Sequence, residues 1–172
     1  MLQLYNGSFI AEELVVQHPE MAKLHPQSLN TVRLATVRYP DRIDVLHSFM
    51  RIGCGNCSID NNGDHMLVAS VDFRTGCVTA ACDPQGRFVT VHPDTGIDLI
   101  GFRIPYWEEA IAFAKELAGV VPEELVVGWD VAITDNGPVM IEGDSCGGWA
   151  WQLPEKKGAR EELNMLLKDL NV

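Results

Sequence analysis

The chain has 172 residues, of which 47% are apolar and 22% are charged, a profile typical of one soluble globular domain. Its 13 basic and 24 acidic residues leave a net charge of −11, and the basic residues form no stripe that could follow a nucleic acid. No apolar run approaches the ~20 residues that cross a bilayer, and the N-terminus lacks a signal-peptide pattern. We therefore expect a cytoplasmic protein that binds neither nucleic acid nor membranes.

The first half of the chain predicts strands separated by polar segments. Residues 53–65 (GCGNCSIDNNGDH) are too polar for a core and too long for a turn, and loops of this length are often functional. A loop or broken helix is expected at 18–30. Strands are expected at 8–12, 31–38, 44–52, 66–72, 77–82 and 87–91.

The second half combines helices with one hairpin. Apolar spacing predicts helices at 107–118 and 159–170, and Gly119 ends the first. Residues 125–134 and 138–143 form the hairpin. Strands in the middle and helices near the end indicate an α+β fold, an antiparallel β-sheet with flanking helices, in a single domain spanning 1–172.

Five cysteines without a signal peptide favour reduced thiols: Cys54, Cys57, Cys77, Cys82 and Cys146. The spacing of the first four comes near that of a zinc site, so a zinc-stabilised binding protein is one alternative. However, Cys77 and Cys82 lie five residues apart on one expected strand, which points their side chains to opposite faces. Buried free thiols are the expectation.

The hairpin carries a group of carboxylates. A three-residue loop at 135–137 gives one clean apolar face, with Val139 and Ile141 on it. This register places Asp130 directly opposite Glu142, with Asp144 diagonal to Asp130 on the same polar face. Opposed carboxylates repel, and a hard cation such as Mg²⁺ would reverse that cost. The alternative is a solvated acidic face.

Residues 128–149 (GWDVAITDNGPVMIEGDSCGGW) resemble the C-terminal signature of the ATP-grasp superfamily, in which an Asp strand and a Glu-x-Asn strand hold the Mg²⁺ ions of Mg-ATP. Residues 9–38 are similar to the adenine-hinge strand and the following strand of the sugar-transfer-associated branch, which is related to the alpha-L-glutamate ligases. Three further motifs occur in that branch's order: SIDNNG (58–63), HPDTG (92–96) and IPYWEEA (104–110). The resemblance covers most of the chain.

The resemblance implies ATP and Mg²⁺ as ligands. The hinge that binds the adenine edge through backbone groups would be Glu12, Glu13 and Leu14. The metal-binding residues would be Asp130, Glu142 and Asp144, where the family usually has Asn at the last position.

The resemblance also implies three catalytic residues. Arg33 would face the terminal phosphate and the acyl-phosphate intermediate. Arg51 and Asn61 would help to hold phosphate or the acceptor substrate. From the strand pattern alone, both arginines could instead be exposed strand residues without a function.

The implied activity is that of an ATP-dependent carboxylate–amine ligase, with substrates that the sequence does not name. ATP-grasp enzymes bind ATP between two lobes, and this chain starts at what resembles the hinge, with no lysine-bearing strand before residue 9 and no phosphate-binding glycine loop. We therefore expect a C-terminal lobe whose N-terminal lobe is absent, or a homo-oligomer, with weak Mg-ATP binding and little turnover. The alternative is a non-catalytic nucleotide-binding or interaction module derived from such an enzyme.

Overall fold

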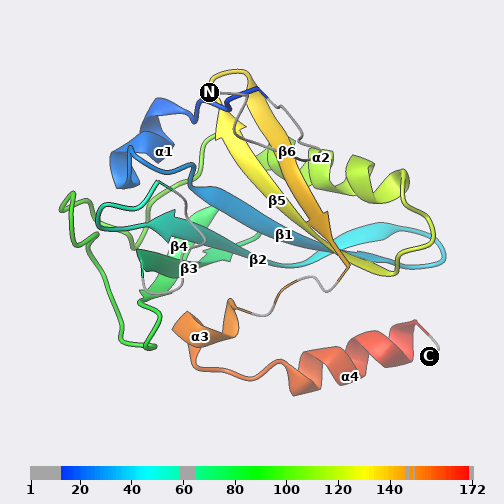
Figure 1. Cartoon of the computed structure of the whole chain (residues 1–172). Helices are drawn as coiled ribbons and strands as arrows, with labels where there is room; N and C mark the ends of the chain where they lie inside the picture. Colours follow the sequence, from blue (N-terminus) through cyan, green and yellow to red (C-terminus); the bar gives the residue numbers. More distant parts are fainter. Residues whose placement is uncertain (1–12, 59–64, 146–147, 149, 171–172) are drawn as a thin grey trace, which may run out of the picture.

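A computed structural model describes residues 13–58, 65–145, 148 and 150–170. Its described strands form one six-stranded antiparallel sheet in the order β4-β3-β2-β1-β5-β6 (Figure 1). The strands are β1 (Thr31–Arg38), β2 (Ile43–Gly53), β3 (Met66–Asp72), β4 (Cys77–Cys82), β5 (Val126–Thr134) and β6 (Gly137–Asp144). The expected α+β fold with an antiparallel sheet is confirmed.

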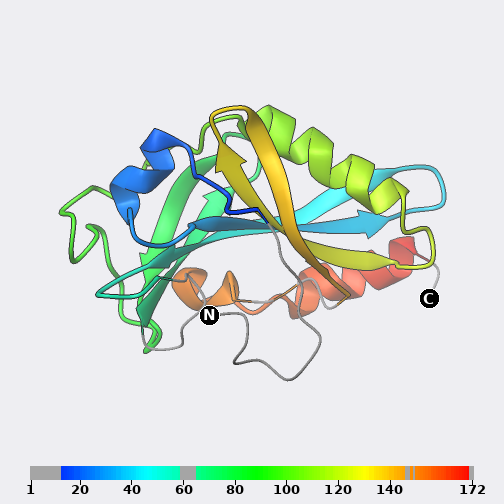
Figure 2. The same ribbon diagram turned by 45° about the horizontal axis from the view of Figure 1, so that its top comes forward.

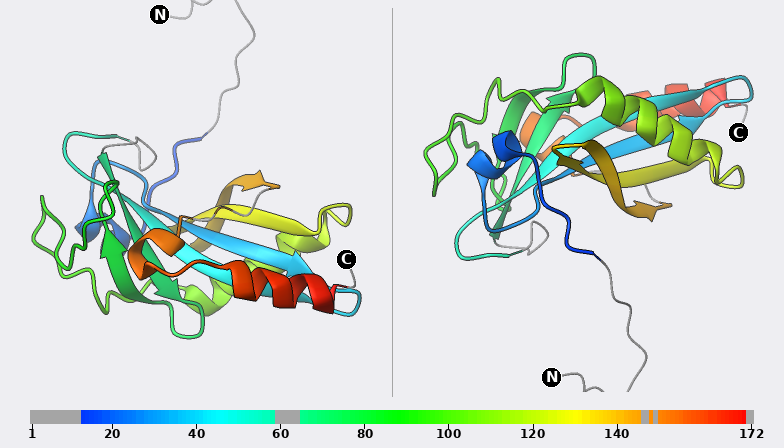
Figure 3. Two further views of the ribbon diagram at one scale, coloured as in Figure 1. Left: turned by 90° about the horizontal axis from the view of Figure 1, so that it is seen from below. Right: turned by 90° about the horizontal axis from the view of Figure 1, so that it is seen from above.

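Helices cover both faces of this sheet. Viewed from below and from above, helices α3 and α4 lie on the face opposite α2 (Figure 3), and Figure 2 shows the same arrangement obliquely. The helices are α1 (Pro19–Leu24), α2 (Trp107–Gly119), α3 (Gln152–Glu155) and α4 (Arg160–Asp169). Within the described ranges, no helix is long and apolar enough to span a membrane.

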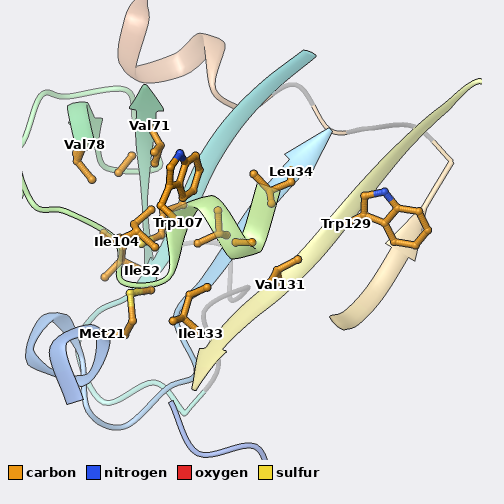
Figure 4. Packing of buried hydrophobic residues seen from close by; sticks show 14 of the residues in the cluster. Met21, Leu34, Ile52, Val71, Val78, Ile104, Trp107, Trp129, Val131 and Ile133 are labelled. Carbon is orange, nitrogen blue, oxygen red and sulfur yellow. The ribbon is translucent and has the colours of Figure 1, made fainter. Parts of the chain in front are cut away.

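The main core lies between the sheet and helices α1 and α2. Alternation along β1 sends Val32 and Leu34 into this core, where both are fully buried. Trp107 packs over the sheet from the start of α2 (Figure 4), and its indole Nε1 donates to Phe73 O at 2.8 Å. Met21 from α1 closes the same core.

The opposite face of the sheet has a smaller apolar cluster and more polar residues. Phe49, Val68 and Cys82 pack there with Trp151 and Ala159 from the C-terminal segment. This segment is attached to the sheet through Ser70, whose Oγ donates to Trp151 O at 3.2 Å. The remaining surface of this face is available for polar side chains.

The observed register of the β5–β6 hairpin differs from the expected one near the turn. Thr134 pairs with Gly137, so the loop has two residues rather than three. The register then shifts between Asp130 and Val131, because a β-bulge inserts one extra residue in β6. That extra residue restores the expected pairing of Asp130 with Glu142.

Two other expectations about strands were wrong. Residues 87–91 form only isolated bridges, because the chain turns back at His92, whose N–H donates to Ile97 O at 2.8 Å. Val139 and Ile141 were expected on a buried face, yet they are 38% and 40% exposed. The shorter loop pairs Val139 with Ala132, on the face of Asp130, and Ile141 is the extra residue of the bulge in an edge strand. The strand expected at 8–12 lies outside the described residues.

The cysteines that the structure describes are free thiols. Cys82 belongs to the small cluster of the α3–α4 face, whereas Cys54 packs against the main core. Burial raises the pKa of both thiols, which disfavours the thiolates that zinc needs. In the described part of the chain, no three Cys, His, Asp or Glu side chains are grouped as a metal site.

Two glycines with similar backbone angles differ in their surroundings, which gives a stability test. Gly76 has φ +70° and an added Cβ would lie 2.4 Å from Trp107 Cγ, whereas Gly86 has φ +74° and open space around it. We expect Gly86→Ala to lower the free energy of unfolding by about 1–2 kcal/mol through backbone strain. Gly76→Ala should cost about 1–3 kcal/mol more by overpacking against Trp107. Urea denaturation of both variants measures the difference, and equal losses would contradict this account.

Candidate functional site

Five of the predicted site residues form a row across four neighbouring strands on the α3–α4 face of the sheet. The row consists of Arg33, Arg51, Asp130, Glu142 and Asp144. Thr31 on β1 pairs with Arg51 on β2, and Arg33 pairs with Asp130 on β5. Asp130 in turn pairs with Glu142 on β6. Because residues directly opposite in an antiparallel pair share a face, the alternation of these strands brings the charges together.

Arg33 is the centre of this row. Its Nε donates to Asp130 Oδ1 at 2.5 Å and its Nη2 to Asp130 Oδ2 at 2.9 Å, which is a bidentate ion pair. Its Nη1 donates to Asp144 Oδ2 at 3.1 Å. The Nη2 atom lies 3.8 Å from Glu142 Oε1. One guanidinium therefore contacts all three carboxylates.

Arg51 completes the group from the other side of β1. Its Nη2 donates to Asp130 Oδ2, and its Nε and Nη2 each lie 3.3 Å from Thr31 Oγ1. Arg33 is 5% exposed, and the side chain of Arg51 is 12% exposed. The alternative that these are exposed strand residues is therefore wrong.

The charges in the row shift one another's proton affinities. Burial acts to lower the pKa of Arg33, but its hydrogen bonds to Asp130 and Asp144 outweigh burial and raise the pKa above its ordinary value. A hydrogen bond to Asp130 and the negative charge of that group raise the pKa of Glu142. Arg33 therefore stays charged, and Glu142 gains a proton more readily than an isolated glutamate.

A cavity of ≈ 500 Å³ has the predicted hinge on its wall, but its described lining includes neither the two arginines nor the three carboxylates of the row. Glu13 and Leu14 line it, and so does Ile141, the residue before Glu142. Leu14 and Val16 are 92% and 73% exposed, so they offer apolar surface at its mouth. The size suits a small organic ligand.

Two predicted residues have no described position. Glu12 of the hinge and Asn61 of the polar loop lie outside the described residues.

Sequence reasoning missed the residues that support the cavity wall. The Gln17 amide donates to His25 O at 3.0 Å and to Ser28 O at 2.6 Å, and its Oε1 accepts from Asn30. Asn30 is fully buried and accepts from Gly53 N at 3.2 Å. This network joins the hinge to the start of the polar loop, and only the side-chain types at 17 and 30 hinted at it.

Sequence reasoning also missed an aromatic group beside Arg33. The ring of His47 lies 5.1 Å from that of Trp151 and 6.4 Å from that of Phe49. An added Cβ at Gly148 would lie 3.2 Å from Arg33 Nη1, so Gly148 lies close to the guanidinium. The C-terminal segment therefore packs on the small apolar cluster and approaches Arg33 at Gly148.

A family model described as sugar-transfer associated ATP-grasp matches residues 4–168, nearly the whole chain. The chain belongs to the sugar-transfer associated ATP-grasp family. Membership supports an ATP-binding, ligase-like module, and ATP-grasp proteins generally bind ATP and Mg²⁺. Searches of curated proteins and of solved structures give no match.

The carboxylates of this ATP-grasp chain suit Mg²⁺ by their oxygen chemistry, although their side chains are not grouped as a metal site in the described part of the chain. Mg²⁺ takes oxygen ligands and is often held by one or two carboxylates together with substrate phosphates. The side chains of Glu142 and Asp144 are 60% and 41% exposed, so a hydrated cation can reach them. Asp130 is 1% exposed and engaged by arginines.

His47 gives the site a measurable pH dependence. Burial first, and then the charge of Arg33, lowers the pKa of His47 to about 4 from 6.5. Between these values the unfolded chain binds a proton that the folded chain excludes. Stability should therefore fall as the pH drops from about 7 to 4, and His47 should account for up to about 3 kcal/mol of the loss.

Urea denaturation at a series of pH values tests this in the wild type and in His47→Gln. The variant has no titrating ring, so its stability should change less over this range. Identical pH profiles would show that His47 does not stay neutral in the fold.

Proposed function

We propose that this chain is the Mg-ATP-binding lobe of an ATP-dependent carboxylate–amine ligase that acts through an acyl phosphate. The observation that carries the proposal is the row of two arginines and three carboxylates on one sheet face. Family membership supplies the ligand class. The row supplies fixed positive groups for phosphate oxygens and carboxylate oxygens for a divalent cation.

Each part of the site has a role in this proposal. The hinge residues Glu13 and Leu14, with Glu12 before them, would hold the adenine edge by backbone groups and apolar contact. The carboxylate group of Asp130, Glu142 and Asp144 would serve Mg²⁺ binding. Bound Mg²⁺ would neutralise charge on the phosphates.

The arginines would act on the reacting groups. Arg33 and Arg51 are held in fixed positions by Asp130, so they can stabilise charge on a transferred phosphoryl group without being reoriented first. Asn61 remains a candidate for binding the acceptor. An amine would then attack the activated carboxylate and release phosphate.

Calorimetric titration with Mg-ATP tests the binding step. Glu142→Gln should weaken Mg-ATP affinity by about tenfold or more, because it removes one charged ligand. Glu116→Gln is the matched control, because Glu116 is an exposed glutamate on α2, on the opposite face of the sheet. No binding by the wild type, or equal effects of both variants, would refute the proposal.

An assay of ADP release separates the ligase from the non-catalytic alternative. A ligase lobe should release ADP slowly, in keeping with the little turnover expected of a single lobe, and only when mixtures of carboxylate and amine substrates are supplied. Binding of Mg-ATP without ADP release under all such mixtures would favour a nucleotide-binding module.

A further inference from the structure

The HPDTG motif (92–96) supplies none of the site residues, yet its side chains bind distant parts of the chain. His92 and Asp94 hydrogen-bond to backbone groups at the start of the polar loop, 39 positions earlier in the sequence. Thr95 hydrogen-bonds to the end of α1, 71 positions earlier. One short turn therefore connects two segments that are far from it in the sequence.

Two side chains of the motif hold the start of the polar loop. His92 is fully buried, and its Nε2 donates to Gly53 O at 2.9 Å. Because a carbonyl only accepts, Nε2 carries the proton, and Nδ1 accepts from the N–H groups of Asp94 and Thr95 at 3.3 and 3.4 Å. Burial lowers the pKa of His92, which keeps the ring neutral and Nδ1 free to accept. Asp94 Oδ2 accepts from Gly55 N at 2.6 Å.

The same two glycines are also held from the side of the cavity. Gly53 N donates to Asn30 Oδ1 at 3.2 Å, and Gly55 O accepts from His25 Nε2 at 3.0 Å. Asn30 donates in turn to Oε1 of Gln17, a residue of the cavity wall, at 3.0 Å. Side chains therefore bind the N–H and the C=O of both glycines, and the start of the loop is fixed between the motif and the cavity wall.

The third side chain of the motif holds another part of the cavity wall. Thr95 Oγ1 donates to Leu24 O at 3.1 Å, at the end of α1. Ala22 and Pro26, on either side of Leu24 in the sequence, line the cavity, and so does Ser58 of the polar loop. The motif itself contributes no residue to the described lining. It therefore lies behind two parts of the wall rather than on its surface.

We infer that the HPDTG motif is a positioning element for the cavity, in which His92, Asp94 and Thr95 hold the polar loop and the end of α1 in the arrangement that binds the adenosine end of the ligand. The inference rests on the proposed function, in which the hinge takes the adenine edge. A wall that is held in place before binding does not have to be ordered when the ligand arrives. Loss of these hydrogen bonds should therefore weaken affinity although the ligand loses no direct contact.

Three variants of exposed aspartates test this inference. Asp94→Ala removes the acceptor of the Gly55 N–H, whereas Asp94→Asn removes the same charge and keeps an oxygen that can accept. Asp98→Ala is the matched control, because Asp98 is an exposed aspartate of the same loop that takes no part in the hydrogen bonds to the polar loop. The probe is adenosine, which is uncharged, so that a change in protein charge has little direct effect on its affinity.

Chemical-shift titration with adenosine measures the dissociation constant of each variant, and urea denaturation measures its stability. Asp94→Ala should bind adenosine about threefold to tenfold more weakly than the wild type, as expected when one or two wall groups have to be ordered on binding. Asp94→Asn and Asp98→Ala should stay within about twofold of the wild type.

Several outcomes would overturn the inference. A loss of stability in Asp94→Ala with unchanged affinity would show that the turn only stabilises the fold. An equal loss of affinity in Asp94→Asn or in Asp98→Ala would show that the hydrogen bond to Gly55 is not the cause. Wild-type binding of Mg-ATP but not of adenosine would overturn the inference and leave the proposed function standing. Binding of neither would refute both.

If Asp94→Ala does not fold, Thr95→Val gives the answer from the other part of the wall. Valine keeps the shape of the side chain and removes the hydroxyl that donates to Leu24 O. Thr90→Val is its control, because Thr90 is an exposed threonine of the same loop whose hydroxyl is not part of these hydrogen bonds. Thr95→Val should bind adenosine at least about threefold more weakly than Thr90→Val. Equal affinities would overturn the inference.

Discussion

The buried carboxylate of Asp130, with its two arginines, constrains the register of the central strands. A charge in a protein interior is costly unless it is paired and hydrogen-bonded, and here the partners come from β1 and β2 while the carboxylate is on β5. A slip of one residue in β1 would turn Arg33 into the apolar core beneath α2 and bring Val32 out. The ion pairs and the core therefore require the same alignment.

With this alignment, the two faces of the sheet carry different kinds of side chains. The face under α1 and α2 is apolar and supplies most of the buried hydrophobic surface. The other face has a small apolar cluster, which includes Trp151, and the charged row toward β5 and β6. The Trp151 ring lies 5.1 Å from that of His47 on β2. The main apolar core and the charged row are thus separated by one thickness of sheet, so that polar groups need not interrupt the core.

Local pattern was enough to predict the strands of this sheet, because their apolar and polar residues alternate strongly: β1, β3 and β4 have the predicted bounds. It also predicted the pairing of Asp130 with Glu142, but from a three-residue loop. The loop has two residues, and the bulge in β6 adds the one residue that restores this pairing. The burial of Arg33 could not be predicted, because its partner Asp130 lies 97 positions away in the sequence. The strand expected at 87–91 was wrong because the loop at 83–106 forms turns with local backbone hydrogen bonds in place of a strand ladder.

The charge of the row bears on which ligands it can accept. The positive charges of the two guanidinium groups nearly cancel the negative charges of the three carboxylates, in a protein whose net charge is −11. A polyphosphate alone would meet the carboxylates and the acidic surface, and a divalent cation alone would meet the arginines. When both arrive together, each charge faces its opposite and the balance of the row is kept. An acidic protein can therefore bind a triphosphate without a basic surface, provided that the opposing charges are fixed a few ångströms apart by the strands that carry them.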